Sequence, residues 1–167
     1  MTLFHLSLEN EKIEKFSPKI PEVRAFLEDG EIPRICLSAS LDGCLSSVAW
    51  GGCKLHNVVG NSTKIRVYEF NEEDILPGNL IGSIELYQSG KVVDADETGE
   101  VWVINQELIP FKSYLIEITD YEGDEEEIIS YENLKHCDET GESIFDFIET
   151  TVIIISEVEY KIIEENV

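Results

Sequence analysis

Residues 99–116 read GEVWVINQELIPFKSYLI, and this stretch indicates the fold more clearly than any other part of the sequence. Glu100–Ile104 is rich in β-branched and aromatic residues, which favours a strand that begins at the glutamate. Asn105–Glu107 is a short polar break, and Ser113–Thr119 then alternates polar and apolar residues, as a half-buried strand does. The stretch therefore predicts two strands joined by a short connection.

The sequence before this stretch predicts three more strands and a helix. Thr2–Leu8 and Lys64–Phe70 alternate polar and apolar residues, and Arg34–Ser38 is compact and mostly apolar. Residues 40–50 are expected to form a helix, because apolar side chains recur there at helical spacing and Ser40 is a good N-cap.

The remaining segments predict further strands, turns and a second short helix. Leu80–Tyr87 is expected to be a strand, and Asp94–Gly99 a polar turn. Asp120–Glu127 predicts a solvated acidic loop, and Ile128–His136 a short helix. Thr150–Ile163 is rich in β-branched residues and predicts one or two strands.

Strands combined with one or two short helices indicate the α+β class. The chain has 167 residues, of which 43% are hydrophobic, so it has the size and the apolar content of one ordinary domain. We therefore predict a single domain that spans residues 1–167.

The net charge of −23 is distributed unevenly along the chain. Residues 1–69 carry eight Lys/Arg and nine Asp/Glu, whereas residues 70–167 carry four Lys/Arg and twenty-six Asp/Glu. Such acidity repels phosphate backbones, and a nucleic-acid-binding protein normally presents a basic face. We therefore expect no direct nucleic-acid partner.

The composition also predicts a cytoplasmic protein without a membrane partner. The longest apolar run, Val152–Ile155, is far shorter than the ~20 residues of a spanning helix. The chain start lacks the basic and apolar regions of a secretory signal. The four cysteines are therefore expected to be thiols, with two disulfides as the alternative.

Three segments, Phe4–Ser7, Arg34–Ser40 and Gly99–Ile116, together carry a family resemblance. They resemble the catalytic fold of ADP-ribosyltransferases, in the branch whose active site holds a His, an aromatic residue and a Glu. The resemblance implies a split β-sheet core over residues 1–118 and does not cover the rest of the chain. We predict that residues 119–167 form an acidic C-terminal extension packed on this core. The chain is also similar to uncharacterised proteins of Gram-positive bacteria and their phages.

The resemblance implies that NAD is bound and that its nicotinamide–ribose bond is cleaved. Glu100 corresponds to the catalytic glutamate, whose carboxylate stabilises positive charge on the ribose. His5 corresponds to the residue that holds the adenosine-side ribose, and backbone groups of Leu6, beside Ser7, to those that hold the nicotinamide amide. The cleft residues implied before the helix are Ser38 and Ser40.

Two positions depart from the family pattern. Leu6 stands where the family has glycine, and Cys36 aligns with the aromatic residue that stacks on nicotinamide. A thiol cannot stack, so Trp50 or Tyr68 is a candidate substitute. The nearly neutral N-terminal half suits the approach of an anionic dinucleotide.

Plainer interpretations of these residues remain open. His5 and Glu100 are also consistent with structural or surface roles, and Cys36 with a small buried hydrophobe. A second chemistry is a zinc site, which lacks a Cys-x-x-Cys pair and would draw its ligands from Cys44, Cys53, His56, His136 and Cys137.

The competing class of function is non-enzymatic. A dense carboxylate face imitates a phosphate backbone and steers association with a basic surface. Residues 117–165 supply such a face. This alternative predicts an acidic inhibitor or adaptor that occupies the basic surface of a partner protein.

Overall fold

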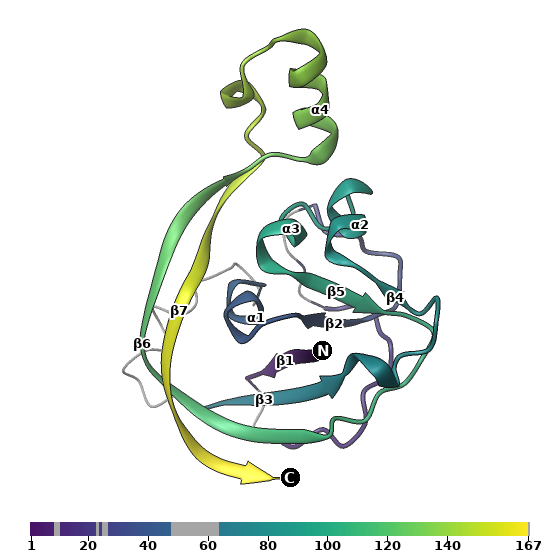
Figure 1. The fold of residues 1–167 in the computed structure, drawn as a ribbon, viewed down its shortest axis with the longest axis vertical. Coiled ribbons are helices and arrows are strands. Elements are labelled where there is room, and N and C mark those ends of the chain that lie inside the picture. The colour runs from purple at the N-terminus through teal and green to yellow at the C-terminus, as the bar shows by residue number, and fades with distance from the viewer. Residues whose placement is uncertain (9–10, 23, 25–26, 48–63, 167) are drawn as a thin grey trace.

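A computed structural model describes residues 1–8, 11–22, 24, 27–47 and 64–166 (Figure 1). In these residues seven strands form one sheet in the order β4-β5-β2-β1-β3-β6-β7, and four short α-helices accompany it. All six pairs of neighbouring strands are antiparallel. The α+β class predicted from the sequence is therefore confirmed.

The bounds of the strands and helices are as follows in chain order. The strands are β1 (Thr2–Ser7), β2 (Ile35–Ser38), β3 (Lys64–Asn71), β4 (Leu80–Ile81), β5 (Glu100–Val103), β6 (Lys112–Ile128) and β7 (Thr150–Asn166). The helices are α1 (Leu41–Ser47), α2 (Ser83–Gln88), α3 (Ala95–Thr98) and α4 (Tyr131–Thr140), with short 3-10 turns η2 (Glu72–Asp74) and η3 (Ile144–Phe147).

The strand predicted over Leu80–Tyr87 is wrong beyond its first residues. Only Leu80–Ile81 is a strand, and Ser83–Gln88 forms α2. In a strand, Ile84 and Leu86 would lie on the same face. In the structure Leu86 is fully buried and Ile84 is exposed, so their spacing does not mark a buried strand face. Gly82 at the N-cap separates the two elements.

Two predicted non-regular segments are also regular structure. Asp94–Gly99, predicted as a turn, contains α3. Gly99 caps the C-terminus of this helix, and its φ of 69° is the left-handed conformation typical of that position. Asp120–Glu127, predicted as a loop, belongs to β6. Asp124–Glu127 lie opposite the β-branched residues 151–154 of β7, so a partner strand with high β-propensity compensates for their own low propensity.

The ladder between β1 and β2 is much shorter than its neighbours. β1 pairs with β3 over six residues and β2 pairs with β5 over four, but β1 and β2 share only the pair Phe4 and Ser38. The sheet is thus divided between a β4-β5-β2 half and a β1-β3-β6-β7 half, which diverge beyond this single pair.

Three apolar clusters pack against the sheet. The central cluster includes residues of both halves, among them Leu37, Val101 and Tyr68, with Phe16 of the β1–β2 connection packed into it. A second cluster lies between β3, β6, α1 and β7, and a third surrounds Trp102 of β5. The body of the protein therefore has apolar residues on both faces of its sheet.

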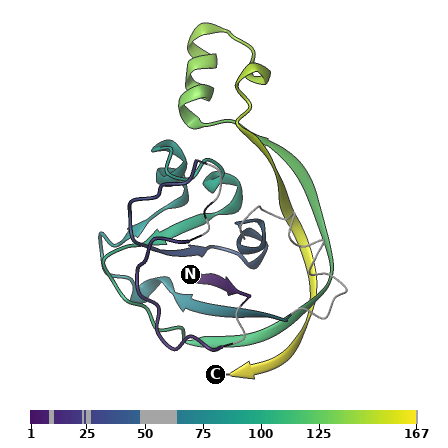
Figure 2. The same ribbon diagram turned by 180° about the vertical axis from the view of Figure 1, so that it is seen from behind.

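β6 and β7 continue past the body as a long two-stranded ribbon with α4 and η3 at its tip, as Figures 1 and 2 show from opposite sides. The predicted division at residue 118 falls inside β6, so the acidic extension is continuous with the sheet. Among the described residues, no helix has the length and apolar character needed to cross a membrane.

Gly43 provides a test of how closely α1 packs on α3. A Cβ added at Gly43 would lie 2.0 Å from the backbone oxygen of Thr98, which cannot move without shifting α3. We expect Gly43→Ala to lower the free energy of unfolding by about 3 kcal/mol or more. Gly82→Ala, where nothing lies within 4 Å, is the control and should change it by less than about 1 kcal/mol. Equal denaturation midpoints for the two variants would contradict this packing.

Candidate functional site

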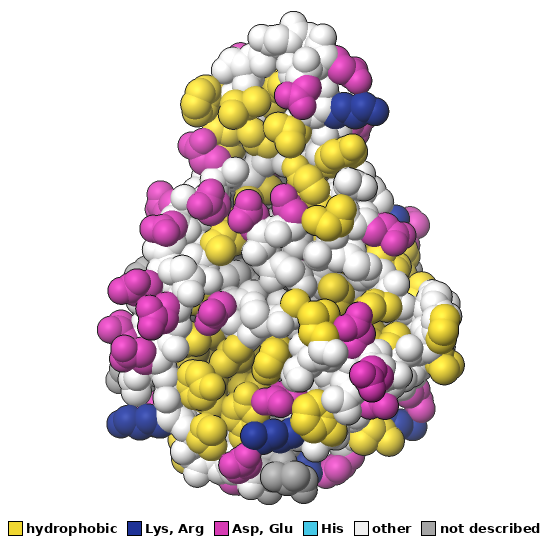
Figure 3. Space-filling view, viewed as in Figure 1, with side chains coloured by type: hydrophobic (Ala, Val, Ile, Leu, Met, Phe, Trp, Pro, Cys, Tyr) yellow, Lys and Arg dark blue, Asp and Glu magenta, His cyan; other side chains and the backbone are white. Residues whose placement is uncertain are grey.

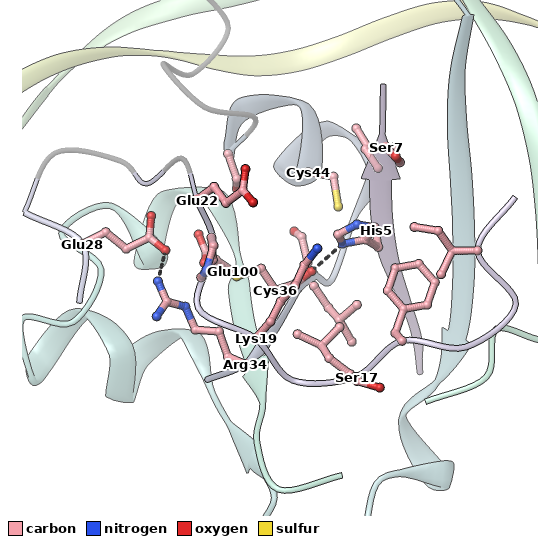
Figure 4. A pocket seen from close by; sticks show the side chains of 18 of the residues that line it. His5, Ser7, Ser17, Lys19, Glu22, Glu28, Arg34, Cys36, Cys44 and Glu100 are labelled. Atoms are coloured by element: carbon pink, nitrogen blue, oxygen red, sulfur yellow. Dashed lines mark hydrogen bonds and ion pairs between the residues drawn. The ribbon is translucent and has the colours of Figure 1, made fainter. Parts of the chain in front are cut away.

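A cavity of about 600 Å³ lies where β1 and β2 diverge (Figure 4). Its size is within the range of small-molecule sites. Its lining includes six of the seven residues that the sequence nominated: His5, Leu6, Ser7, Cys36, Ser38 and Glu100. These residues come from β1, β2 and the start of β5, so segments far apart in the sequence meet at one site.

His5 bridges the gap between the diverging strands. Its Nδ1 donates a hydrogen bond of 2.9 Å to the backbone oxygen of Cys36. Burial lowers the pKa of His5 below its usual value, and the charge of Lys19 acts in the same direction. The ring is therefore neutral at pH 7, and with Nδ1 protonated its Nε2 is a hydrogen-bond acceptor.

Glu100 is the most perturbed carboxyl group of the cavity. It opens β5 and is only 7% exposed, and its Oε1 accepts a 2.7 Å hydrogen bond from the Trp102 indole. Burial raises the pKa of Glu100 to about 7, and the negative charge of Glu28 contributes in the same direction. Near neutral pH this group therefore exchanges between its acid and its carboxylate forms.

Glu28 is a second carboxylate beside Glu100, and the sequence analysis missed it. The sulfur of Cys36 and one carboxylate oxygen each of Glu28 and Glu100 all lie within 4.8 Å of one another. Two ionised carboxylates at that distance repel by about 3 kcal/mol at an effective dielectric constant near 20. This repulsion is one reason why Glu100 holds its proton more tightly than an isolated glutamate.

Arg34 compensates part of this negative charge. Its side chain is fully buried, forms a close ion pair with Glu28, and lies 3.9 Å from the centroid of the Trp102 ring. Arg34 Nη1 also donates a 2.9 Å hydrogen bond to the backbone oxygen of Ile32. The guanidinium is thus fixed by a carboxylate, a carbonyl and an aromatic face.

Cys36 lies between these charges. Burial raises the pKa of its thiol well above the usual range, and the charges of Glu100 and Glu28 raise it further. The thiol is therefore protonated at neutral pH and is not an activated nucleophile.

The serines differ in position. Ser7 and Ser38 line the cavity, but the Ser38 hydroxyl is buried and donates a 2.9 Å hydrogen bond to the Thr98 carbonyl. Ser40 is exposed and does not line the cavity; its hydroxyl accepts a 3.0 Å hydrogen bond from Gly43 N at the start of α1. Ser38 and Ser40 thus have structural roles at the β2–α1 junction.

Neither candidate for the missing aromatic residue is placed in the cavity by the described structure, but a third aromatic residue is. Tyr68 is fully buried in the central cluster, and its hydroxyl accepts a 2.8 Å hydrogen bond from Ile13 N, so it is not available to a ligand. Trp50 lies outside the described residues. Phe16 does line the cavity, with its ring centroid 5.0 Å from that of His5.

In the described part of the chain, the one group of side chains that could hold a metal ion is Glu28, Cys36 and Glu100. Arg34 already supplies a positive charge there, so the geometry alone does not require a metal.

Of the residues predicted for zinc, Cys44, His136 and Cys137 do not form such a group. Cys53 and His56 lie outside the described residues, and Cys36, Cys44 and Cys137 are free thiols.

No protein-family model, curated protein or solved structure matches this chain. Comparison therefore identifies no fold family, and the function has to be argued from the cavity.

Substitution of Glu100 tests its electrostatic environment. A carboxyl group with a pKa near 7 in the folded state and 4.5 as its reference stabilises the fold at low pH, and this stability is lost as the pH rises through 7. Glu100→Gln removes that loss while keeping an oxygen for Trp102. We expect the variant to gain about 2–3 kcal/mol relative to the parent between pH 5 and pH 8, measured by denaturant unfolding.

The control for this measurement is Glu85→Gln, which changes an exposed glutamate on α2. If both variants follow the parent equally across the pH range, the buried and charge-coupled environment of Glu100 is disproved.

Proposed function

We propose that the chain is an ADP-ribosyltransferase-like protein that binds NAD in this cavity and cleaves its nicotinamide–ribose bond. The observation that carries the proposal is the convergence of His5, Cys36 and Glu100, from β1, β2 and β5, on one cavity. These are the positions at which the family has its His, aromatic and Glu residues.

The strand arrangement also supports the proposal. The resemblance implies a split sheet, and the single-residue ladder between β1 and β2 divides this sheet next to the cavity. It also implies a glutamate that opens a strand, and Glu100 is the first residue of β5.

The chemistry of the lining suits a dinucleotide. Lys19 is exposed and lines the cavity on the His5 side, where a cation would favour a diphosphate. Nε2 of the neutral His5 ring can accept a hydrogen bond from a ribose hydroxyl. Leu6 lies in regular pairing with Val67, so its backbone is extended, and its side chain packs on the second apolar cluster.

Glu100 would carry the chemical step. Cleavage of an N-glycosidic bond builds positive charge on the ribose, and a fixed carboxylate in a buried site stabilises that charge. The Trp102 indole orients the Glu100 carboxylate. Cys36 offers an apolar contact instead of a stacking ring, so Phe16 is the described aromatic residue nearest this role.

The enzyme proposal predicts distinct effects of two substitutions. With millimolar NAD, the parent should show calorimetric binding and release nicotinamide. Glu100→Gln should lower the release by at least about 100-fold while NAD still binds, because the charge that stabilises the transition state is lost. His5→Ala should instead weaken binding by about tenfold.

The pH dependence provides an internal check. The rate should rise with pH through about 7, since the carboxylate form of Glu100 is the active one. The proposal fails if the parent shows neither heat of binding nor nicotinamide release.

A second candidate function, an acidic adaptor, rests on the ribbon. Figure 3 shows acidic side chains along the margin where Figure 1 shows β6 and β7. Residues 124–127 are all exposed and acidic, and they lie on the part of β6 that extends from the body. Such a surface suits the basic face of a partner protein.

This second function predicts binding that depends steeply on salt. Binding to core histones should weaken at least tenfold between 50 and 300 mM salt, because the ions screen exposed charges. Reversing the charges of residues 124–127 to lysine should abolish it. The control reverses the exposed Glu11, Glu14, Glu73 and Glu85, which gives the same net charge away from the ribbon tip. Equal losses in both variants would exclude a specific role of the ribbon.

A further inference from the structure

Glu28 and Glu100 form a carboxylate pair that opens on the cavity. Both residues line it, and little of either is exposed: 9% of the Glu28 side chain and 7% of the Glu100 residue. They come from unrelated parts of the chain, since Glu28 lies in the connection before β2 and Glu100 begins β5. Figure 4 shows both carboxylates on the same side of the cavity.

A fixed set of side chains orients this pair. Arg34 binds the Glu28 carboxylate, and Trp102 donates to the Glu100 carboxylate. Arg34 and Trp102 are themselves stacked, with the guanidinium carbon 3.9 Å from the ring centroid. The two carboxylates are therefore held in a constant relation to each other by a buried cation and the ring beneath it.

The separation of the pair suits one small molecule between them. Ligand atoms of Glu28 and Glu100 lie within 4.8 Å of each other. A water that donates two hydrogen bonds of about 2.7 Å holds its acceptors roughly 4.4 Å apart, because its O–H bonds meet near the tetrahedral angle. One water molecule can therefore bind to both groups at once.

The pair also allows a division of roles. Paired carboxylates in glycoside hydrolysis act on different atoms, one on the developing sugar cation and the other on the proton of the attacking water. With Glu100 beside the ribose, Glu28 would be the proton acceptor. The low exposure of both groups favours water over a bulky protein side chain as the nucleophile.

On this basis, and resting on the proposed function, we propose that Glu28 is a second catalytic residue, a general base that directs the cavity toward hydrolysis of NAD. The water oxygen forms a bond with the ribose carbon as the carbon–nitrogen bond breaks. Nicotinamide leaves as a neutral molecule with the bonding electron pair. The water proton passes to Glu28 and from there to solvent, and the products are ADP-ribose and nicotinamide.

The test is Glu28→Gln, with azide as a nucleophile that carries no proton. The amide can still accept a hydrogen bond from Arg34 but cannot act as a base. We expect this variant to keep its calorimetric affinity for NAD within about threefold and to lose about 100-fold in nicotinamide release. Azide should restore release at least tenfold in Glu28→Gln, with ADP-ribosyl azide as the product. It should not restore release in Glu100→Gln.

The matched control is Asp29→Asn. Asp29 also contacts Arg34, at 3.9 Å, but it does not line the cavity. This variant should retain the parent rate within about twofold.

Each contrary outcome has a separate meaning. A parent that releases nicotinamide while Glu28→Gln is equally fast overturns the role of Glu28 and leaves the proposed function intact. Loss of rate in Glu28→Gln without azide rescue, matched by Asp29→Asn, shows a purely structural effect and also overturns it. Transfer of ADP-ribose to protein in place of free ADP-ribose overturns the assignment of water. A parent that releases no nicotinamide overturns both proposals.

Discussion

The interrupted ladder between β1 and β2 is the constraint on which the cavity depends. Neighbouring strands in a sheet normally exchange backbone hydrogen bonds along their shared length. Here Phe4 and Ser38 form the single pair, and the imidazole of His5 then binds the Cys36 carbonyl. A side chain that replaces a backbone donor keeps the strands linked while their backbones separate. Because β1 and β2 are fully paired with β3 and β5 on their other sides, the gap between them has rigid walls.

The pKa values of two buried carboxyl groups in and near the cavity are raised, first by burial and then by neighbouring negative charge. Burial raises the pKa of Glu100 to about 7 and that of Asp94, which lies outside the cavity lining, to about 6, and the negative charge of Glu28 contributes to both shifts. The fully buried guanidinium of Arg34 forms an ion pair with Glu28 and so offsets part of this negative charge. Groups with strongly shifted pKa values gather at functional sites more often than elsewhere.

Local sequence patterns predicted most strands but not the whole site. The alternation in Lys64–Phe70 and the β-branched residues after Glu100 depend on nearby residues alone. Glu28 has no such pattern, since it reaches the cavity only through a loop that Arg34 secures. The acidic residues of Asp120–Glu127 disfavour a strand by themselves, and their strand conformation requires pairing with the distant β7. Interactions between distant segments therefore explain both the missed residue and the incorrect loop.

The contact between α1 and β7 makes the acidic ribbon part of the same folding unit as the cavity. Ile155 donates its backbone N–H to the buried hydroxyl of Ser46 at 2.8 Å, and its side chain packs with Leu45 and Ile65. A chain shortened at residue 118 would lose this isoleucine and expose the apolar surface of α1. The ribbon is therefore not a tail that can be removed to study the cavity alone. Charge substitutions in the ribbon therefore leave this contact in place, whereas deletion of the hairpin removes it.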